Sequence, residues 1–337
     1  MSAVRIGING FGRIGRCVFK QFLARDGFEV VGFNDLADLG DLAYLLKYDS
    51  VHGWYPRRIS VDGRTMRVDD KKVRFFSERS PADIPWNDLG VDIVVESSGA
   101  FRGRSDAAGH LRAGAKKVLI SAPSDDADGM FVYGVNHDTY DAAVHDVISC
   151  ASCTTNCLAP VAKVLLDRFG VEHMMITTIH AYTSSQALMD TPVRKRRRGR
   201  AAAVSIIPTT TGAAKATARV LPELEGRVDG MAMRVPVPDG SVTDIVTMLG
   251  RRVTADDVNG AIEEACSRPP LEGVLRMSDE ALVSRDIVGD PHSSIVDRES
   301  TMVVRDRVVK IISWYDNEWG YSARLVDMAS HLAAAGL

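Results

Sequence analysis

Apolar residues in the first half of the chain form short runs, separated by stretches in which they recur at helical spacing. The runs predict strands at residues 4–9, 29–34, 91–96 and 117–121, with short ones at 131–133 and 147–148. Helices are predicted at residues 16–23, 38–48 and 105–113, and residues 57–76 are expected to form short alternating strands. Strands and helices that alternate in this way predict an α/β fold with a mostly parallel, doubly wound sheet.

The pattern changes after Cys153, where the predicted strands become longer. They cover residues 174–179, 230–235, 242–249 and 308–314, and helices are predicted at 158–169, 213–221 and 255–268. This predicts an α+β domain whose sheet is covered on one side, and a last helix, 320–335, is expected to pack back on the first domain. We expect domains at 1–152, completed by a C-terminal helix at about 318–337, and at 153–317.

The composition is that of a globular protein. The 337 residues are 45% hydrophobic and 25% charged, with a net charge of −3, which argues against a protein that binds polyanions over its whole surface. The five cysteines form no CxxC pair, so the sequence favours a reducing compartment over a zinc site or a disulfide framework. No apolar run approaches the length of a membrane span. We expect a cytoplasmic protein without a metal site.

A GxGxxG motif follows the first predicted strand and opens the first predicted helix. Gly10 permits a tight turn, Gly12 lets a pyrophosphate approach the backbone, and Gly15 lets helix and strand pack closely. The next strand ends in Asp35, where a carboxylate would bind the adenosine ribose hydroxyls; its alternative role is to cap the following helix. In this setting the motif predicts a Rossmann-type site for NAD, because a carboxylate at position 35 repels the 2′-phosphate of NADP.

Cys153 lies at the start of a predicted helix, among small hydroxyl residues that are typical of an N-cap. Unpaired backbone N–H groups and the helix dipole favour an anion there, so its pKa is expected to be lowered. His180 lies where the run 174–179 gives way to a loop. A cysteine and a distant histidine form the usual pair for covalent catalysis, whereas each alone has a structural role as its simpler explanation.

Several segments have the chemistry of a phosphate site. Thr209, Thr210, Thr211 and Gly212 precede a helix, and Ser152 and Thr154 flank Cys153 at another helix start. Arg198 and Arg200 lie in a loop and Arg234 ends a strand, where a guanidinium suits phosphate oxygens. Together they predict a substrate with one phosphate and a second anion of similar size. The six basic residues at 194–200 also suggest nucleic-acid binding; the absence of interleaved aromatic residues and the position in the middle of a domain argue against it.

These segments together resemble the phosphorylating glyceraldehyde-3-phosphate dehydrogenase family, and the similarity runs essentially from end to end. It is carried by the blocks at 8–16, 45–49, 151–157, 207–215 and 314–321, of which Ala-Ser-Cys-Thr-Thr-Asn-Cys is the most specific. The resemblance implies an NAD-dependent enzyme in which Cys153 attacks glyceraldehyde 3-phosphate and His180 takes a proton. Hydride transfer to NAD then gives a thioester that inorganic phosphate converts to 1,3-bisphosphoglycerate. It also implies a homotetramer, and it makes domain 1–152 the NAD-binding domain and 153–317 the catalytic domain.

The resemblance further implies roles for individual residues. Thr183 and Arg234 would hold the substrate phosphate, and the attacking phosphate would be held by Ser152, Thr154, Thr211, Gly212 and Arg198. The cofactor would be held by Gly10, Gly12, Arg13, Ile14, Gly15, Asp35, Arg79, Ser97, Ser121, Asn317 and Tyr321.

Departures from the family pattern cluster around the same site. Cys150 stands where the family usually has Asn, Ser184 and Ser185 replace an Asn and an Asp, and Lys195 replaces an acid in the basic loop. These changes leave three alternatives to the main hypothesis: a relative that acts on erythrose 4-phosphate, an isoform that resists an electrophilic inhibitor, and a paralogue retained for binding RNA or a protein partner. Thr191 also replaces a bulky apolar residue that helps to exclude NADP, so we expect NAD to be preferred and some NADP to be tolerated.

Overall fold

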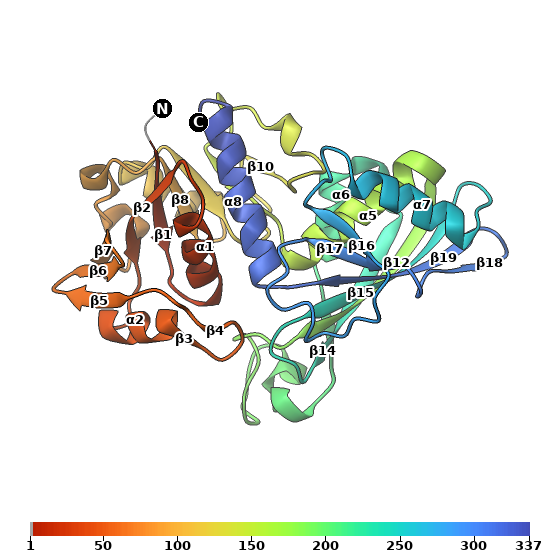
Figure 1. Ribbon diagram of the computed structural model, residues 1–337, viewed down its shortest axis with the longest axis horizontal. Helices are drawn as coiled ribbons and strands as arrows, with labels where there is room; N and C mark the ends of the chain where they lie inside the picture. Colours follow the sequence, from red (N-terminus) through yellow and green to blue (C-terminus); the bar gives the residue numbers. More distant parts are fainter. Residues whose placement is uncertain (1–2) are drawn as a thin grey trace. The chain divides into compact units, whose positions relative to one another are not determined.

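Two sheets organise the chain, one in each of two compact units. The structure is a computed structural model and describes residues 3–337 (Figure 1). The first unit comprises residues 3–131, 137–151 and 322–337, and the second comprises residues 132–136 and 152–321. No helix within residues 3–337 has both the length and the apolar character needed to span a membrane.

The sheet of the first unit is mostly parallel. Its strands follow the order β10-β11-β9-β8-β1-β2-β7-β6-β5, and the pairs β7–β6 and β6–β5 at one edge are antiparallel. The strands are β1 (Val4–Asn9), β2 (Phe28–Asn34), β5 (Ile59–Asp62), β6 (Thr65–Val68), β7 (Lys71–Phe76), β8 (Ile93–Glu96), β9 (Lys117–Ile120), β10 (Gly129–Met130) and β11 (Val147–Ser149). Two short strands, β3 (Tyr48–Asp49) and β4 (Gly53–Trp54), pair separately. The predicted doubly wound α/β sheet is confirmed.

The helices of this unit are α1 (Arg13–Leu23), α2 (Leu39–Lys47), α3 (Arg104–Ala107), α4 (Gly109–Arg112) and most of α8 (Trp319–Ala334). The prediction of one helix at 105–113 is wrong, because the chain breaks before Gly109, a residue that disfavours a helix interior. The strand predicted at 131–133 is also wrong: the N–H of Val132 donates to the side chain of Asn136 in a turn. Within this unit, the Nη1 of Arg25 lies 2.9 Å from the Oδ1 of Asp327 on α8.

The second unit contains a mixed sheet with helices on one face. In order across the sheet, its strands are β13 (Ile207–Thr210), β14 (Val228–Val235), β12 (Val171–Ala181), β15 (Ser241–Leu249), β19 (Val308–Tyr315), β17 (Ser294–Asp297) and β16 (Leu275–Ser278), and β18 (Met302–Val304) pairs with β19. Helices α5 (Cys153–Phe169), α6 (Ala213–Val220) and α7 (Ala255–Cys266) cover one face of it (Figure 1). Buried residues alternate with more exposed ones along much of β15, as expected for a sheet with one covered face.

The turn at Gly10 gives a test of the first unit's packing. Gly10 has a φ of 88°, and a Cβ there would lie 2.4 Å from the backbone of Ser98. Gly27, with a φ of 86°, has no atom within 4 Å of its would-be Cβ. Gly27→Ala therefore adds backbone strain alone and should lower the free energy of unfolding by about 1 kcal/mol.

Gly10→Ala adds a steric clash to the same strain and should cost at least about 1 kcal/mol more than Gly27→Ala. Urea unfolding of both variants measures the difference. Equal losses would show that the turn tolerates a side chain at position 10.

Candidate active site

Helix α5 places a cysteine at its first position. The side chain of Ser152 caps the helix, and its Oγ accepts a hydrogen bond from the N–H of Thr155 at 3.1 Å. Cys153 therefore begins the first turn, where backbone N–H groups have no intrahelical partner. Its side chain remains partly accessible, whereas Cys157, one turn further along, is buried. The predicted position of Cys153 at a helix start is confirmed.

Strand β12 brings a histidine to this helix start. His180 is the next-to-last residue of β12, and its Nε2 lies 3.4 Å from the Sγ of Cys153. The other ring nitrogen, Nδ1, lies 2.7 Å from the carbonyl oxygen of Ala181. When Nδ1 carries the proton and donates to this carbonyl, Nε2 presents its lone pair to the thiol. The structure thus brings together the two residues that the sequence proposed as a pair.

Parallel pairing of β12 with β14 sets an arginine beside the histidine. The register places Arg234 opposite His180, and the Nη1 of Arg234 donates to the carbonyl oxygen of Ala181 at 2.7 Å and lies 2.6 Å from Nδ1. Because a guanidinium N–H can only donate, the contact with Nδ1 favours a lone pair there and competes with the tautomer that donates to the carbonyl. The guanidinium adds a positive charge next to the imidazole. It therefore opposes a second positive charge on that ring.

Burial controls the charges of the pair. It raises the pKa of the Cys153 thiol to about 11, although Arg234 and the N–H and hydroxyl of Thr154 act in the opposite direction. Burial and, after it, the charge of Arg234 lower the pKa of His180 to about 3. The expected lowered pKa of Cys153 is therefore wrong for the sulfur by itself. Transfer of the thiol proton to Nε2 creates both charges together, so each stabilises the other.

Tyr315 is a site residue that the sequence did not predict. Its hydroxyl lies 2.9 Å from the Oγ1 of Thr154 and 2.8 Å from the Oγ1 of Thr178, and its ring meets the His180 ring edge-on at 6.0 Å. It holds α5 and β12 together from the end of β19. The Trp-Tyr-Asp block at 314–316 was the only available signal, and it carried no indication of this contact.

The residues assigned to phosphate lie in two neighbouring loops and at two helix starts. The Nε of Arg198 donates to the Oγ1 of Thr209 at 3.0 Å, and its Nη1 reaches the Oγ of Ser185 at 3.4 Å. The same Ser185 hydroxyl lies 2.8 Å from the Oγ1 of Thr183. Ser185 therefore links Thr183, assigned to one phosphate, with Arg198, assigned to the other. Of the remaining residues, Gly212 is the N-cap of α6, and the Oγ1 of Thr211 accepts from the N–H of Ala213 at 3.1 Å.

A cavity in the first unit is lined by most of the strand-end residues assigned to the cofactor. Its walls include Gly10, Gly12, Asp35, Arg79 and Ser97. A Cβ at Gly12 would meet no atom within 4 Å, so a side chain there would extend into this open space. A Cβ at Gly15 would lie 2.0 Å from the carbonyl oxygen of Gly10, so helix and turn approach as only glycine permits. These features fit a bound pyrophosphate.

The other residues assigned to the cofactor lie elsewhere. Ile14 and Gly15 belong to the first turn of α1, Ser121 directly follows β9, and none of them is among the residues that line the cavity. Asn317 and Tyr321 belong to the second unit, where the Oδ1 of Asn317 accepts from the Oγ of Ser241 at 2.6 Å.

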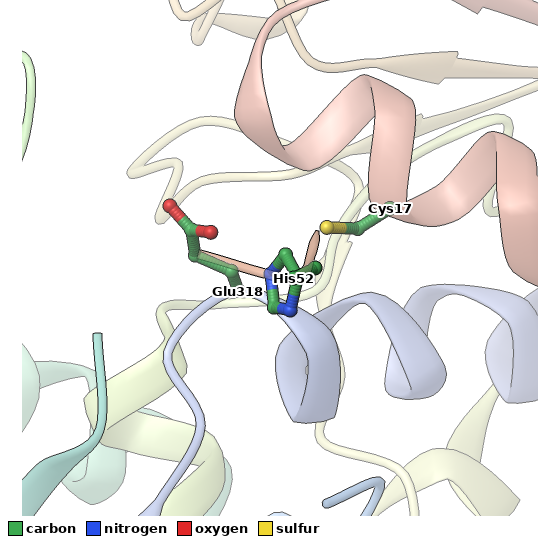
Figure 2. A group of neighbouring side chains, drawn as sticks. All are labelled: Cys17, His52 and Glu318. Carbon is green, nitrogen blue, oxygen red and sulfur yellow. The ribbon is translucent and has the colours of Figure 1, made fainter. Parts of the chain in front are cut away.

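Arg13 is held by a turn of the first unit. Its Nη1 donates to the Oδ2 of Asp49 at 2.7 Å. Burial tends to raise the pKa of Asp49, but Arg13 and the N–H groups of His52 and Val51 bring it down to about 2. The ring of His52 lies near the thiol of Cys17 on α1, with a nitrogen within 4.8 Å of the sulfur (Figure 2). This turn therefore packs against the helix that carries Arg13.

Two acidic residues, Asp316 and Glu318, flank Asn317 in the sequence, and Asp239 lies close to both in the structure. Asp239 and Asp316 are 2% and 1% exposed, and Oδ1 of Asp316 accepts from the N–H of Trp319 at 2.6 Å. Burial, together with the nearby carboxylates of Asp316 and Glu318, holds the pKa of Asp239 well above its ordinary value. This environment favours the protonated, neutral form of Asp239.

Comparison with known proteins gives a consistent result. A family model described as "Glyceraldehyde 3-phosphate dehydrogenase, NAD binding domain" matches residues 4–104, and one described as "Glyceraldehyde 3-phosphate dehydrogenase, C-terminal domain" matches residues 152–317. Glyceraldehyde-3-phosphate dehydrogenase of Geobacillus stearothermophilus is 55% identical over 99% of this chain and 100% of that protein. Glyceraldehyde-3-phosphate dehydrogenase 1 of Bacillus subtilis (strain 168) is 56% identical over 99% of this chain and 100% of that protein. Glyceraldehyde-3-phosphate dehydrogenase of Streptomyces coelicolor is 55% identical over 96% of this chain and 97% of that protein.

The Cys153–His180 pair predicts a change in the pH dependence of alkylation. His180→Asn removes the group that accepts the thiol proton, while burial still raises the pKa of Cys153. The rate of iodoacetamide alkylation at pH 7 should fall by at least about tenfold, and the profile should move to higher pH. Wild-type and variant rates between pH 5 and 10, with the labelled residue identified by mass spectrometry, test this. An unchanged profile would mean that His180 does not assist ionisation.

Asp239 predicts a stability that depends on pH. Because its folded pKa is raised, the folded state binds a proton that the unfolded chain has released above about pH 4, and stability falls as pH rises toward the folded pKa. Asp239→Asn removes this loss. Its free energy of unfolding, relative to wild type, should increase steadily from pH 5 to pH 8 in urea titrations. A difference that stays constant with pH would contradict a protonated Asp239.

Proposed function

Because the chain belongs to the glyceraldehyde 3-phosphate dehydrogenase family, we propose that Cys153 and His180 carry out that family's reaction. Family membership rests on relatives that match over nearly the full length of both proteins. The chain is therefore an NAD-dependent oxidoreductase of glycolysis that acts on glyceraldehyde 3-phosphate. The observation that supports our assignment of residues is the 3.4 Å contact between Sγ and Nε2 at the start of α5.

In the first half-reaction, the Cys153 sulfur attacks the aldehyde carbon as its proton moves to Nε2 of His180. The resulting oxyanion is stabilised by the backbone N–H of Cys153 and by the imidazolium. The imidazolium returns its proton to the oxyanion, which gives the thiohemiacetal. His180 then takes this hydroxyl proton as the carbon-bound hydrogen leaves as a hydride, which leaves a thioester on Cys153. NAD bound in the first unit would accept this hydride.

In the second half-reaction, inorganic phosphate attacks the thioester and releases 1,3-bisphosphoglycerate. We assign the attacking phosphate to Ser152, Thr154, Thr211, Gly212 and Arg198, and the substrate phosphate to Thr183 and Arg234. The N-termini of α5 and α6 support the first assignment, since each presents backbone N–H groups to an anion. The position of Arg234 supports the second, because a phosphate on its guanidinium neutralises the charge that opposes an imidazolium at His180.

We assign NAD to Gly10, Gly12, Arg13, Ile14, Gly15, Asp35, Arg79, Ser97 and Ser121, with Asn317 and Tyr321 at the nicotinamide. Residues 1–152, completed by the helix at about 318–337, form the NAD-binding domain in this proposal, and residues 153–317 form the catalytic domain. Asp35 supports a preference for NAD: its carboxylate accepts from the N–H groups of Phe11 and Ala37, which fixes its position at the cavity wall.

We also assign a homotetramer and a cytoplasmic location. Residues 182–206 contain four apolar side chains that are 69% to 80% exposed in the single chain: Leu188, Met189, Val204 and Ile206. Apolar side chains gathered on one loop are typical of a surface that a second copy covers. The five cysteines are all free thiols, which suits a reducing compartment.

Initial rates test the proposed function. With glyceraldehyde 3-phosphate and NAD, the wild type should need inorganic phosphate for turnover, and Cys153→Ser should lose at least about 10³-fold in kcat. The rate with NADP should give a lower kcat/KM than with NAD. Turnover of erythrose 4-phosphate alone, without a need for phosphate, would contradict the proposal.

Ser185 gives a sharper prediction about the attacking phosphate. Ser185→Asp places a carboxylate beside Nη1 of Arg198, where it competes with phosphate for the guanidinium. The KM for phosphate should rise by about tenfold, with a much smaller change in the KM for NAD. Ser184→Asp adds the same charge at the exposed neighbouring position and serves as the matched control. Equal effects of the two variants would point to general electrostatics and not to the contact with Arg198.

A further inference from the structure

A buried carboxylate lies directly behind the glycine turn of the first unit. Glu96, the last residue of β8, is 2% exposed. Its Oε1 accepts from the N–H of Ser98 at 2.8 Å and from the hydroxyl of Ser98 at 2.5 Å. Its Oε2 accepts from the Nδ2 of Asn9 at 2.5 Å and contacts the Nε2 of His110 at 3.0 Å. Both oxygens are thus committed to hydrogen bonds inside the protein.

The histidine is itself fixed by an indole. The Nε1–H of Trp86 donates to Nδ1 of His110 at 2.9 Å, and both side chains are fully buried. Because an indole N–H only donates, Nδ1 of His110 accepts and the ring proton lies on Nε2. Nε2–H therefore donates to Glu96. A chain of hydrogen bonds runs from Trp86 through His110 to the carboxylate.

The same chain continues to the wall of the cavity. Oδ1 of Asn9 accepts from the Nδ2 of Asn34 at 2.8 Å, and Oδ1 of Asn34 accepts from the N–H of Glu78 at 2.7 Å. Asn9, Asn34, Glu78 and Ser98 all line the cavity assigned to NAD. They lie at or just beyond the carboxyl ends of β1, β2, β7 and β8. One carboxylate therefore connects the strand ends that surround this cavity.

Gly10 explains why the position of Ser98 matters. A Cβ at Gly10 would lie 2.4 Å from the Cα and N of Ser98, so the glycine turn packs directly on this residue. A shift of Ser98 changes the space left for the turn. We propose that Glu96 is a positioning residue for NAD: it holds Ser98 and Asn9 on either side of the glycine turn, and His110 and Trp86 fix its orientation.

The inference rests on NAD binding in this cavity, as proposed above, and concerns Glu96, which is not among the residues that line the cavity. Glu96→Gln keeps the shape of the side chain but turns one acceptor into an N–H donor. In either orientation, that NH₂ group faces hydrogen-bond donors, so the network cannot close. The dissociation constant for NAD, measured by isothermal titration calorimetry, should rise by about tenfold or more.

Three further variants separate positioning from general destabilisation. Ser98→Ala removes one bond to Glu96 at an exposed position and should weaken NAD binding severalfold without unfolding the chain. Lys117→Met removes a buried lysine that donates to Ala142 and Asp146 in the same unit, and it should leave NAD affinity unchanged even if stability falls. Gly12→Val fills the open space of the cavity and should abolish binding.

Steady-state kinetics complete the test. Glu96→Gln should raise the KM for NAD and leave the KM for glyceraldehyde 3-phosphate unchanged. An enzyme that is merely less stable would not show this difference between the two KM values. Normal NAD affinity in folded Glu96→Gln, together with loss of binding in Gly12→Val, would overturn this inference alone. Normal affinity in Gly12→Val would overturn both the inference and the assignment of NAD to this cavity.

Discussion

The chemistry of this protein depends on one contact, between the sulfur of Cys153 and Nε2 of His180, in a place that disfavours a charge on either group alone. Burial raises the pKa of the thiol and lowers that of the imidazole. The two charges must therefore appear together, by proton transfer across 3.4 Å. A helix start supplies N–H groups to the sulfur and a strand end supplies the ring. Tyr315, bonded to both elements, keeps the distance between them fixed.

Both sheets position functional side chains in the same way: hydrogen bonds from neighbouring strands fix the side chains at the strand ends. In the second unit, the pairing of β12 with β14 puts Arg234 beside His180. In the first unit, Glu96 at the end of β8 ties together the residues around the glycine turn. The acidic cluster at Asp239 has a cost of its own, because burial and the neighbouring carboxylates of Asp316 and Glu318 disfavour a negative charge there.

The sequence predicted the fold class and the pairing of cysteine with histidine because both have local signals. The GxGxxG turn, the cap before Cys153 and the apolar run before His180 are each contained in a few residues. Tyr315 could not be found in this way, since it meets Thr154 through sheet packing across 161 positions of the chain. The lowered pKa expected for Cys153 was wrong for a related reason: the helix start is visible in the sequence, but the degree of burial is not. The break between α3 and α4 was missed because a single glycine is only a weak signal against the helical pattern of the residues around it.

A single-turnover experiment tests the central claim most directly. Enzyme, NAD and glyceraldehyde 3-phosphate are mixed without phosphate, and both NADH formation and the intact mass of the protein are followed. The account predicts a burst of NADH of about one equivalent per active site, an acyl group on Cys153, and further turnover only when phosphate is added. His180→Asn should form the adduct much more slowly. Steady NADH production without phosphate, or an acyl group on a different residue, would contradict the account.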